Sequence, residues 1–224
     1  MDFVNGATVI GTATGANPYS VVWASVPAGT YTLTAVATDS TGATGTTGPV
    51  TLTVTPPSTT SATFVRTDVT TQGTWVGTYG SQGYGLTTDP VAYPAYAQVT
   101  VAGANVHTWA ASTSDGRALQ HASGGGRVAS TWYAGTSFTV DVNLTDGATH
   151  QVALYAVDWD ATTRAERVDV LDAVSGVVLD SQLVSGFHGG QYLVWNLSGH
   201  VTLRVTNVGT PNVVVSGLFF DAVP

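Results

Sequence analysis

The sequence predicts an all-β protein of two domains, and three observations support this fold class. Apolar and polar residues alternate with period two in short runs along the 224 residues, as in half-buried strands. Gly, Pro, Asn and Asp separate these runs, and no stretch has a convincing helical pattern. A Pro- and Ser/Thr-rich run then divides the chain. We expect a small β-sandwich over residues 1–55, a linker at 56–62 and a larger β-sandwich or jelly roll over 63–224.

The first domain contains four runs of alternating residues that predict strands. They are Ala7–Thr12, Tyr19–Trp23, Thr30–Ala37 and Val50–Val54. Turn-forming residues lie between the runs, as expected for a small sandwich. Trp23 and Tyr31 are the natural aromatic residues of its core.

Three stretches of the first domain resemble a bacterial immunoglobulin-like repeat of cell-surface proteins and polysaccharide-degrading enzymes. They are Phe3–Gly6, Tyr19–Trp23 and Val26–Asp39, and the resemblance covers nearly all of residues 2–54. It implies an Ig-like fold, a spacer role and no ligand site. An additional strand usually precedes the first stretch in that family, so we expect this domain to lack its first strand and to leave one sheet edge open.

The linker is predicted from Pro56 and Pro57 and the Ser/Thr residues after them, a combination typical of short, stiff, polar spacers. The composition also changes across it. Asp2 and Asp39 are the only charged residues before it, whereas all six Arg and the other twelve acidic residues follow it. The two domains therefore present different surfaces.

The second domain contains longer strand patterns. The clearest are Tyr96–Val101, Ser137–Leu144, His150–Asp158, Gln191–Leu197, His200–Thr206 and Asn212–Asp221. The window Ala161–Ala173 has the composition of a helix, but Val168 and Val170 alternate and Ser175-Gly176 signals a turn, so we favour a loop followed by a strand. Strands of this number and length predict a two-sheet jelly roll or a related sandwich.

Composition excludes several function classes. The chain has a formal charge of −8 and no Lys, which argues against nucleic-acid binding, because phosphate neutralisation needs basic residues. It has no Cys, so disulfides and thiolate metal sites are excluded. No apolar run approaches a membrane span. No signal peptide is recognisable at Met1, and we interpret the chain as a fragment of a longer protein, secreted or on a bacterial cell surface.

No catalytic motif for nucleophilic, zinc or nucleotide chemistry is present. A glycosidase needs two carboxylates across a cleft, and Glu166 is the only Glu. Asp158 and Asp160, or Asp115 with a distant partner, are the remaining choices. Two acids so close in sequence more often cap a loop or bind an ion, so we predict that the chain is not an enzyme.

Aromatic residues are the first candidates for a ligand site. Trp75, Tyr79 and Tyr84 lie in the Gly-rich segment 73–85, and Trp159 ends an apolar strand between two acids. Exposed rings of this kind stack on the C–H faces of sugars. The alternatives are that Trp75 fills the end of the barrel and that Trp159 shields the Asp158–Arg167 region. Three further Trp lie within apolar strands, and we predict that they are core residues: Trp109, Trp132 and Trp195.

Charged residues are scarce, so each one suggests a specific partner. Asp115 and Arg117 share one loop, and His188 lies in a second Gly-rich loop. We predict that all three contact a ligand, although ion pairs that hold loops in place are an open alternative. Asp221 ends the last strand, where jelly-roll modules often hold a structural calcium, and its oxygen ligands would suit that ion. No other cofactor is expected.

Several stretches of the second domain resemble an accessory module of large secreted bacterial proteins and glycoside hydrolases. They are Thr71–Tyr84, Tyr155–Asp160 with Arg164, Arg167–Asp172 and Gly190–His200, within a match over most of residues 63–222. The resemblance implies a module joined to a catalytic domain and assigns no defined ligand. We expect a carbohydrate-binding module for a polysaccharide or oligosaccharide, behind an Ig-like spacer. The alternative is a structural or adhesive cell-surface module that binds no sugar.

Overall fold

The computed structural model describes residues 1–15, 17–54 and 60–224. The chain forms two compact units, Met1–Pro57 and Ser58–Pro224. Most of the predicted linker lies outside the described residues, but Ser61 and Ala62 already belong to the first strand of the second unit. No helix among the described residues is long and apolar enough to cross a membrane.

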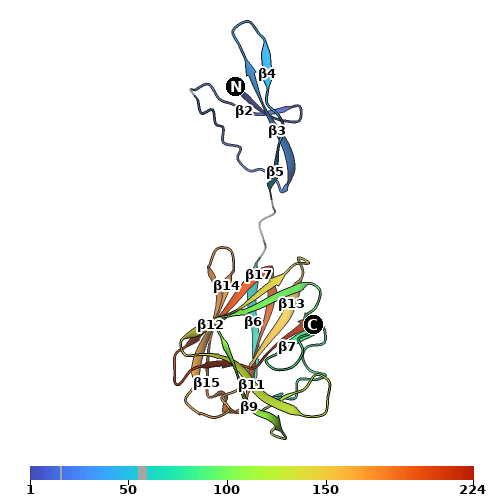
Figure 1. Cartoon of the computed structure of the whole chain (residues 1–224), viewed down its shortest axis with the longest axis vertical. Coiled ribbons are helices and arrows are strands. Elements are labelled where there is room, and N and C mark those ends of the chain that lie inside the picture. The colour runs from blue at the N-terminus through green and yellow to red at the C-terminus, as the bar shows by residue number, and fades with distance from the viewer. Residues whose placement is uncertain (16, 55–59) are drawn as a thin grey trace. The chain divides into compact units, whose positions relative to one another are not determined.

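The N-terminal unit has five strands in one antiparallel sheet (Figure 1). They are β1 (Asp2–Asn5), β2 (Thr8–Thr12), β3 (Gly29–Thr38), β4 (Thr44–Thr46) and β5 (Val50–Val54). The long strand β3 is central, with β1 paired to its last half and β5 to its first half. Three predicted strands are confirmed as β2, β3 and β5. The immunoglobulin-like character of this unit stays a prediction.

The predicted strand Tyr19–Trp23 is wrong, since no strand forms at these residues. Val21 packs against Gly11 of β2, whereas the side chain of Val22 is 91% exposed. Trp23 and Tyr31, the predicted core aromatic residues, pack edge to face with ring centroids 5.0 Å apart, but both are only half-buried. The alternation of this segment therefore reflects contacts of single side chains with the sheet and not strand pairing.

No described residue of the N-terminal unit is fully buried. Its sheet instead carries an apolar hollow of about 370 Å³ between Phe3, Leu33, Ala35 and Val50. This unit is stabilised by a thin, partly exposed apolar layer.

The C-terminal unit is a β-sandwich of two five-stranded sheets, which confirms the all-β prediction. The first sheet has the order β15-β14-β17-β12-β8 and the second β6-β16-β13-β19-β7 (Figure 1). The strands of the first sheet are β8 (Ala97–Ala102), β12 (Ser137–Leu144), β14 (Ala165–Asp172), β15 (Val178–Ser185) and β17 (His200–Asn207). Those of the second are β6 (Ser61–Asp68), β7 (Gly83–Leu86), β13 (Thr149–Ala156), β16 (Gln191–Ser198) and β19 (Gly217–Ala222).

The core lies between these two sheets and follows the predicted alternation. In β12 the residues Phe138, Val140, Val142 and Leu144 are buried, while the residues between them are partly exposed. Trp195 of β16 is fully buried opposite them, as expected. The window Ala161–Ala173 forms a loop and then β14, as favoured from its alternation.

A small third sheet extends the sandwich at one end. Its central strand β11 (Arg127–Ala134) pairs with β9 (Asn105–Thr113), β10 (Leu119–Gln120) and β18 (Val213–Val215). The predicted last strand is thus divided in two at Ser216, with β18 in the small sheet and β19 in the second sheet. This division places the loop before β18 beside the face of β9 and β11.

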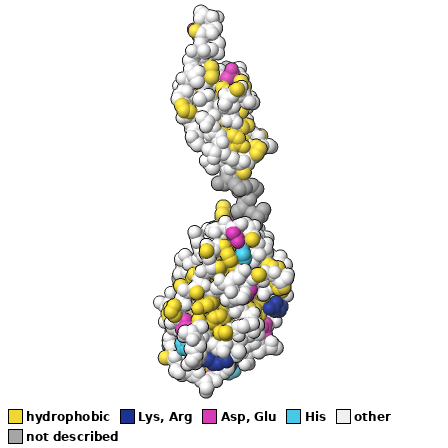
Figure 2. Space-filling model, turned by 90° about the vertical axis from the view of Figure 1, so that its right-hand side faces the viewer, with side chains coloured by type: hydrophobic (Ala, Val, Ile, Leu, Met, Phe, Trp, Pro, Cys, Tyr) yellow, Lys and Arg dark blue, Asp and Glu magenta, His cyan; other side chains and the backbone are white. Residues whose placement is uncertain are grey.

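Charged side chains are few and scattered on the face shown in Figure 2, where uncharged polar side chains and backbone dominate. A charged group that lies in a hollow of such a surface stands out as a candidate for recognition.

Candidate ligand-binding site

One face of the small sheet carries a row of aromatic side chains. His107 and Trp109 lie on β9, Thr131 and Tyr133 lie on β11, and all four line the same hollow. The pairing of the two strands skips Trp109, where the register shifts. His107 lies directly opposite Thr131 in the register. The His107 ring is edge-on to both Trp109 and Tyr133, at 5.8 and 6.2 Å between centroids.

The loop between β13 and β14 lies across this face and contributes three charged residues. Arg164 Nη1 donates to Asp158 at 2.5 Å and to Asp160 at 2.6 Å. The side chains of Arg164 and Asp158 are 3% and 2% exposed. A buried charge needs such partners to offset its lost hydration. Asp160 is different, since its side chain is 52% exposed.

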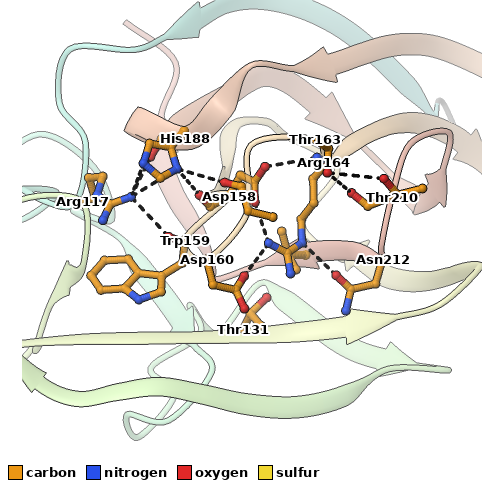
Figure 3. Close-up of polar contacts among 12 residues, drawn as sticks. Arg117, Thr131, Asp158, Trp159, Asp160, Thr163, Arg164, His188, Thr210 and Asn212 are labelled. Atoms are coloured by element: carbon orange, nitrogen blue, oxygen red, sulfur yellow. Dashed lines mark hydrogen bonds and ion pairs between the residues drawn. The ribbon is translucent and has the colours of Figure 1, made fainter.

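A second loop, before β18, contributes Asn212, which forms a polar wall together with Asp160 and Arg164 (Figure 3). Arg164 Nε donates to Asn212 Oδ1 at 2.8 Å, which orients the Asn212 amide. The Thr163 hydroxyl donates to the carbonyl of Thr210 at 3.0 Å. Both contacts join the loop before β14 to the loop before β18, so the guanidinium and the amide are held in place.

These elements enclose a pocket of about 200 Å³. Its lining residues are His107, Trp109, Thr131, Tyr133, Asp160, Arg164, Asn212 and Val214. Burial alone would raise the pKa of Asp160, but the hydrogen bond and charge of Arg164 outweigh it, helped by a hydrogen bond from Trp109, so the pKa lies below its ordinary value. The pocket thus combines an aromatic wall, an ionised carboxylate and fixed amide and guanidinium groups.

Four of the predicted ligand residues lie together beside this pocket. Arg117 forms an ion pair with Asp115 at 2.8 Å and lies over the Trp159 ring, 4.4 Å from its centroid. Its Nη1 also donates to the carbonyl oxygen of His188 at 3.2 Å. The Trp159 ring is stacked beside that of Trp109, with centroids 6.5 Å apart and planes at 22°. Trp159 therefore connects this cluster to the aromatic wall of the pocket.

His188 fixes the geometry of the same loop. It belongs to a short 3₁₀ turn, Phe187–Gly189, and its Nδ1 lies 2.7 Å from the carbonyl oxygen of Asp158 and 3.1 Å from that of Ala161. Two carbonyl acceptors require that Nδ1 carries the proton. Nε2 is then free to accept from Arg117 Nη1, 3.1 Å away (Figure 3).

The expectation that Trp75 and Tyr79 form an exposed sugar platform is wrong, because both rings are buried. Trp75 donates from Nε1 to the carbonyl of Gln120 at 2.8 Å. Tyr79 stacks on Tyr192 at 4.3 Å between centroids. Gly80, with a φ of +73°, lets the turn pass directly over Trp75. The Gly-rich segment therefore covers the outer face of the second sheet.

Tyr84 is half-buried against Trp75, at 4.9 Å between ring centroids. It lines two hollows near Ala122 and is not part of the Trp159 cluster. The predicted aromatic residues therefore belong to two places, and only Trp159 adjoins the polar pocket.

The surroundings of Asp221 do not fit a calcium ion. Its two carboxylate oxygens accept backbone N–H groups of Gly80 and Ser81, at 2.9 and 2.7 Å. Among the described residues, no group of three His, Asp or Glu is arranged to hold a metal. Asp221 holds the turn that covers Trp75.

Complete burial raises the pKa of Glu166 to about 8. The backbone N–H of Val214 donates to its Oε2 at 2.9 Å, and its Oε1 has no hydrogen-bond partner among the described residues. Since it is 0% exposed, it has no access to a ligand in this conformation.

Sequence reasoning missed Trp109, Tyr133 and Asn212 as site residues. Trp109 was expected in the core because its neighbours are apolar, yet it is only half-buried. The period-two pair of Thr131 and Tyr133 on β11 is a usable signal for Tyr133, whereas Trp109 lies at a register shift of β9. No local pattern marks Asn212, which depends on the approach of two distant loops.

No protein-family model matches the sequence, and no curated protein matches it. One solved structure that matches is described as a study of the promiscuous specificity of carbohydrate-binding modules from the β-sandwich superfamily. It is 14% identical over 98% of this chain and 82% of that chain, with a TM-score of 0.28. Another contains CBM51-2 in complex with GlcNAc and INT domains from Clostridium perfringens ZmpB. It is 11% identical over 87% of this chain and 38% of that chain, with a TM-score of 0.31. These TM-scores are too low to support an inference about fold or ligand.

Proposed function

We propose that the chain is a non-catalytic carbohydrate-binding module from a larger secreted bacterial protein, and that its sugar site is the pocket between Trp109 and Asp160. The N-terminal unit would serve as an immunoglobulin-like spacer, and a catalytic domain elsewhere in the parent polypeptide would act on the same glycan. One observation carries the proposal. Aromatic rings and fixed planar polar groups converge on one small hollow of a chain in which charged residues are scarce.

The chemistry of the pocket matches that of a sugar. Sugars present apolar C–H faces, which pack on rings such as Trp109 and Tyr133. Their hydroxyls need donors and acceptors held in fixed positions, and Asp160, Arg164 and Asn212 form such a set. The groups are held before binding, which reduces the ordering cost of association.

A binding role is favoured over catalysis by the state of the acids. Asp160 pairs with the Arg164 guanidinium, which holds its pKa below the ordinary value, so it lacks the raised pKa of a general acid. Asp158 pairs with the same guanidinium and is buried. Glu166 has a raised pKa but is enclosed. A glycosidase needs an acid and a second carboxylate on opposite sides of the scissile bond, and this arrangement provides no such pair across the pocket.

The proposal is tested by affinity electrophoresis and a glycan array with the intact chain, followed by titration calorimetry on the best ligand. Trp109→Ala is expected to weaken binding at least tenfold, about 1.4 kcal/mol, because it removes the stacking surface. The matched control is Trp23→Ala, which removes a Trp from the N-terminal unit and leaves the pocket intact. Absence of binding across plant, algal and microbial glycans, or equal affinity of Trp109→Ala and the wild type, contradicts the proposal.

The second candidate is a structural or adhesive module without sugar binding. It is favoured by the self-contained contacts of Asp158, Arg164 and Asn212, which join two loops without needing a ligand. In that case Asp160→Asn lowers the melting temperature of the C-terminal unit, and no glycan raises it. A glycan-dependent rise in the melting temperature favours the binding module.

A further inference from the structure

The polar wall of the pocket retains hydrogen-bonding capacity that the fold does not use. Arg164 donates from Nε and Nη1, but its Nη2 makes no hydrogen bond with any described residue. The amide of Asn212 accepts at Oδ1, and in the described part of the chain its Nδ2 donates to nothing. Two sets of N–H donors on pocket-lining residues therefore remain for a ligand.

Asp160 supplies the matching acceptor. A carboxylate has about four lone-pair sites, and Arg164 donates to one of its oxygens at 2.6 Å. Its half-exposed position at the wall of the pocket leaves the other sites open. The pocket therefore presents one acceptor, Asp160, and two donors, with Arg164 between Asp160 and Asn212 (Figure 3).

A pair of neighbouring hydroxyl groups fits this pattern. A hydroxyl both donates and accepts, so one hydroxyl donates to Asp160 while it, or its neighbour on the next carbon, accepts from Arg164 or Asn212. A carboxylate or sulfate group would accept from both donors, but it would face the ionised Asp160 without a proton to give. The pattern favours a neutral diol over an anion.

The local charge agrees with this choice. Asp160 lines the pocket, and the buried Asp158 pairs with the same Arg164, so the three groups carry a formal charge of −1 (one positive and two negative). Like charges in a partly desolvated site cost more than in water. An acidic sugar in this pocket is therefore disfavoured.

The size of the pocket limits how much of a glycan enters it. Its volume of about 200 Å³ is below the range of roughly 300–1,000 Å³ that drug-sized ligands occupy. Its walls come from three separate parts of the chain, namely the face of β9 and β11, the loop before β14 and the loop before β18. A hollow of this size suits one sugar unit, and an internal unit would have to pass its chain out on two sides.

We infer that the pocket recognises the terminal, neutral monosaccharide unit of a glycan by two neighbouring hydroxyl groups, with the apolar face of the sugar against Trp109 and Tyr133. This inference rests on the proposed sugar binding of the same pocket and adds the class of ligand. The cluster around Trp159 and Arg117 then lies beside the next sugar unit of the glycan.

The inference is tested by calorimetry with four kinds of probe on the intact chain. They are methyl glycosides of neutral hexoses, the corresponding hexuronic acids, oligosaccharides that end in the preferred unit, and monodeoxy forms of the preferred methyl glycoside. The expected result is that one neutral methyl glycoside binds with an affinity within tenfold of that of its oligosaccharide. The uronic acid and two adjacent monodeoxy forms are expected to bind at least tenfold more weakly.

Variants separate recognition from a merely structural effect. Asp160→Asn is expected to weaken binding of the neutral glycoside about tenfold. The same substitution should raise the affinity for the uronic acid relative to the affinity for the neutral glycoside. Asp146→Asn, on an exposed loop, is the matched control and should change neither. Thermal melting of each variant confirms that it folds.

Two results overturn the inference and leave sugar binding standing. One is binding that requires several units, with the methyl glycoside more than a hundredfold weaker than the oligosaccharide. The other is a uronic acid that binds as well as its neutral counterpart. If no glycan binds at all, the proposed function itself fails.

Discussion

The two units of this chain use similar strand patterns but bury their side chains to very different depths. In the N-terminal unit the five strands form one sheet, and no described residue is fully buried. In the C-terminal unit two sheets enclose Leu154, Trp195 and Leu203, all 0% exposed. Hydrophobic stabilisation scales with the apolar area removed from water. Only the C-terminal unit has the rigid core that is needed to hold loops in a binding geometry.

The largest expected effect comes from the same substitution in both units. Leu154→Ala removes a side chain from the closed core and should destabilise the C-terminal unit by about 2–5 kcal/mol. Leu33→Ala, in the half-buried layer of β3, should cost the N-terminal unit less than about 1 kcal/mol, because part of that side chain is already in water. Hydrogen exchange of the intact chain, followed separately for each unit, measures both. Equal losses would mean that the N-terminal unit has a core of its own.

The second prediction concerns the cost of burying a carboxyl group in the C-terminal unit. Burial raises the pKa of Glu166 from an ordinary value of 4.5 to about 8. The folded chain therefore keeps a proton that the unfolded chain releases above pH 4.5. The stability that the protonated Glu166 contributes is fully present below pH 4.5 and is lost as the pH rises to about 8.

Glu166→Gln removes that ionisation and keeps the acceptor for Val214. We expect the variant to be more stable than the wild type at pH 8, by the order of 2–4 kcal/mol, with little difference at pH 4. Urea unfolding at both pH values measures it. A constant difference across this range would show that Glu166 is not protonated in the folded chain. The N-terminal unit contains no Glu, so its hydrogen-exchange protection serves as the internal control.

The difference between the units also explains which features the sequence predicted. Alternation indicates which face of a strand is apolar, so it predicts the buried faces of β12 and β17 directly. The same pattern at Tyr19–Trp23 failed, because a strand also needs a neighbour with free backbone groups. Alternation therefore predicts local conformation better than it predicts pairing or a second layer.

The binding site was partly predictable for a related reason. Asp115, Arg117, Trp159 and His188 were chosen singly, as rare charged or aromatic residues in loops, and the fold brings them together from three segments. Trp75 and Tyr79 met the same criteria but lie under a Gly-rich turn. Only the approach of loops distant in sequence distinguishes these cases. Asn212 has no local signal at all.

The third prediction compares two aspartates that hold turns. Asp221 accepts two backbone N–H groups at the edge of the C-terminal core, and Asp39 accepts N–H groups of Thr41 and Ala43 in an exposed turn. Asp221→Asn replaces one acceptor with a donor and should cost about 1–3 kcal/mol. Asp39→Asn should cost its own unit less, since water replaces the lost contact.

Thermal melting of the C-terminal unit with and without calcium completes this test. The melting temperature should be the same with added calcium and with a chelator, because amide donors already surround Asp221. A rise with calcium that Asp221→Asn abolishes would restore the calcium site expected from the sequence.

The smallest expected effects come from two tyrosine hydroxyls with similar hydrogen bonds. Tyr192 donates to the carbonyl of Gln72 at 2.6 Å, and its side chain is completely buried. Tyr31 donates to the carbonyl of Pro27 at 2.7 Å in an exposed position. Tyr192→Phe should destabilise its unit by about 1 kcal/mol, because a polar group away from bulk water loses its partner.

Tyr31→Phe should have an effect of less than about 0.5 kcal/mol, since water satisfies the freed carbonyl. Hydrogen exchange of the amides of each unit provides the measurement, with the untouched unit of the same sample as reference. The two hydrogen bonds have nearly the same length, so a difference between the two losses in stability reflects burial and not hydrogen-bond geometry. A larger loss at Tyr31 than at Tyr192 would mean that the exposed turn before β3, and not the apolar layer, holds the N-terminal unit together.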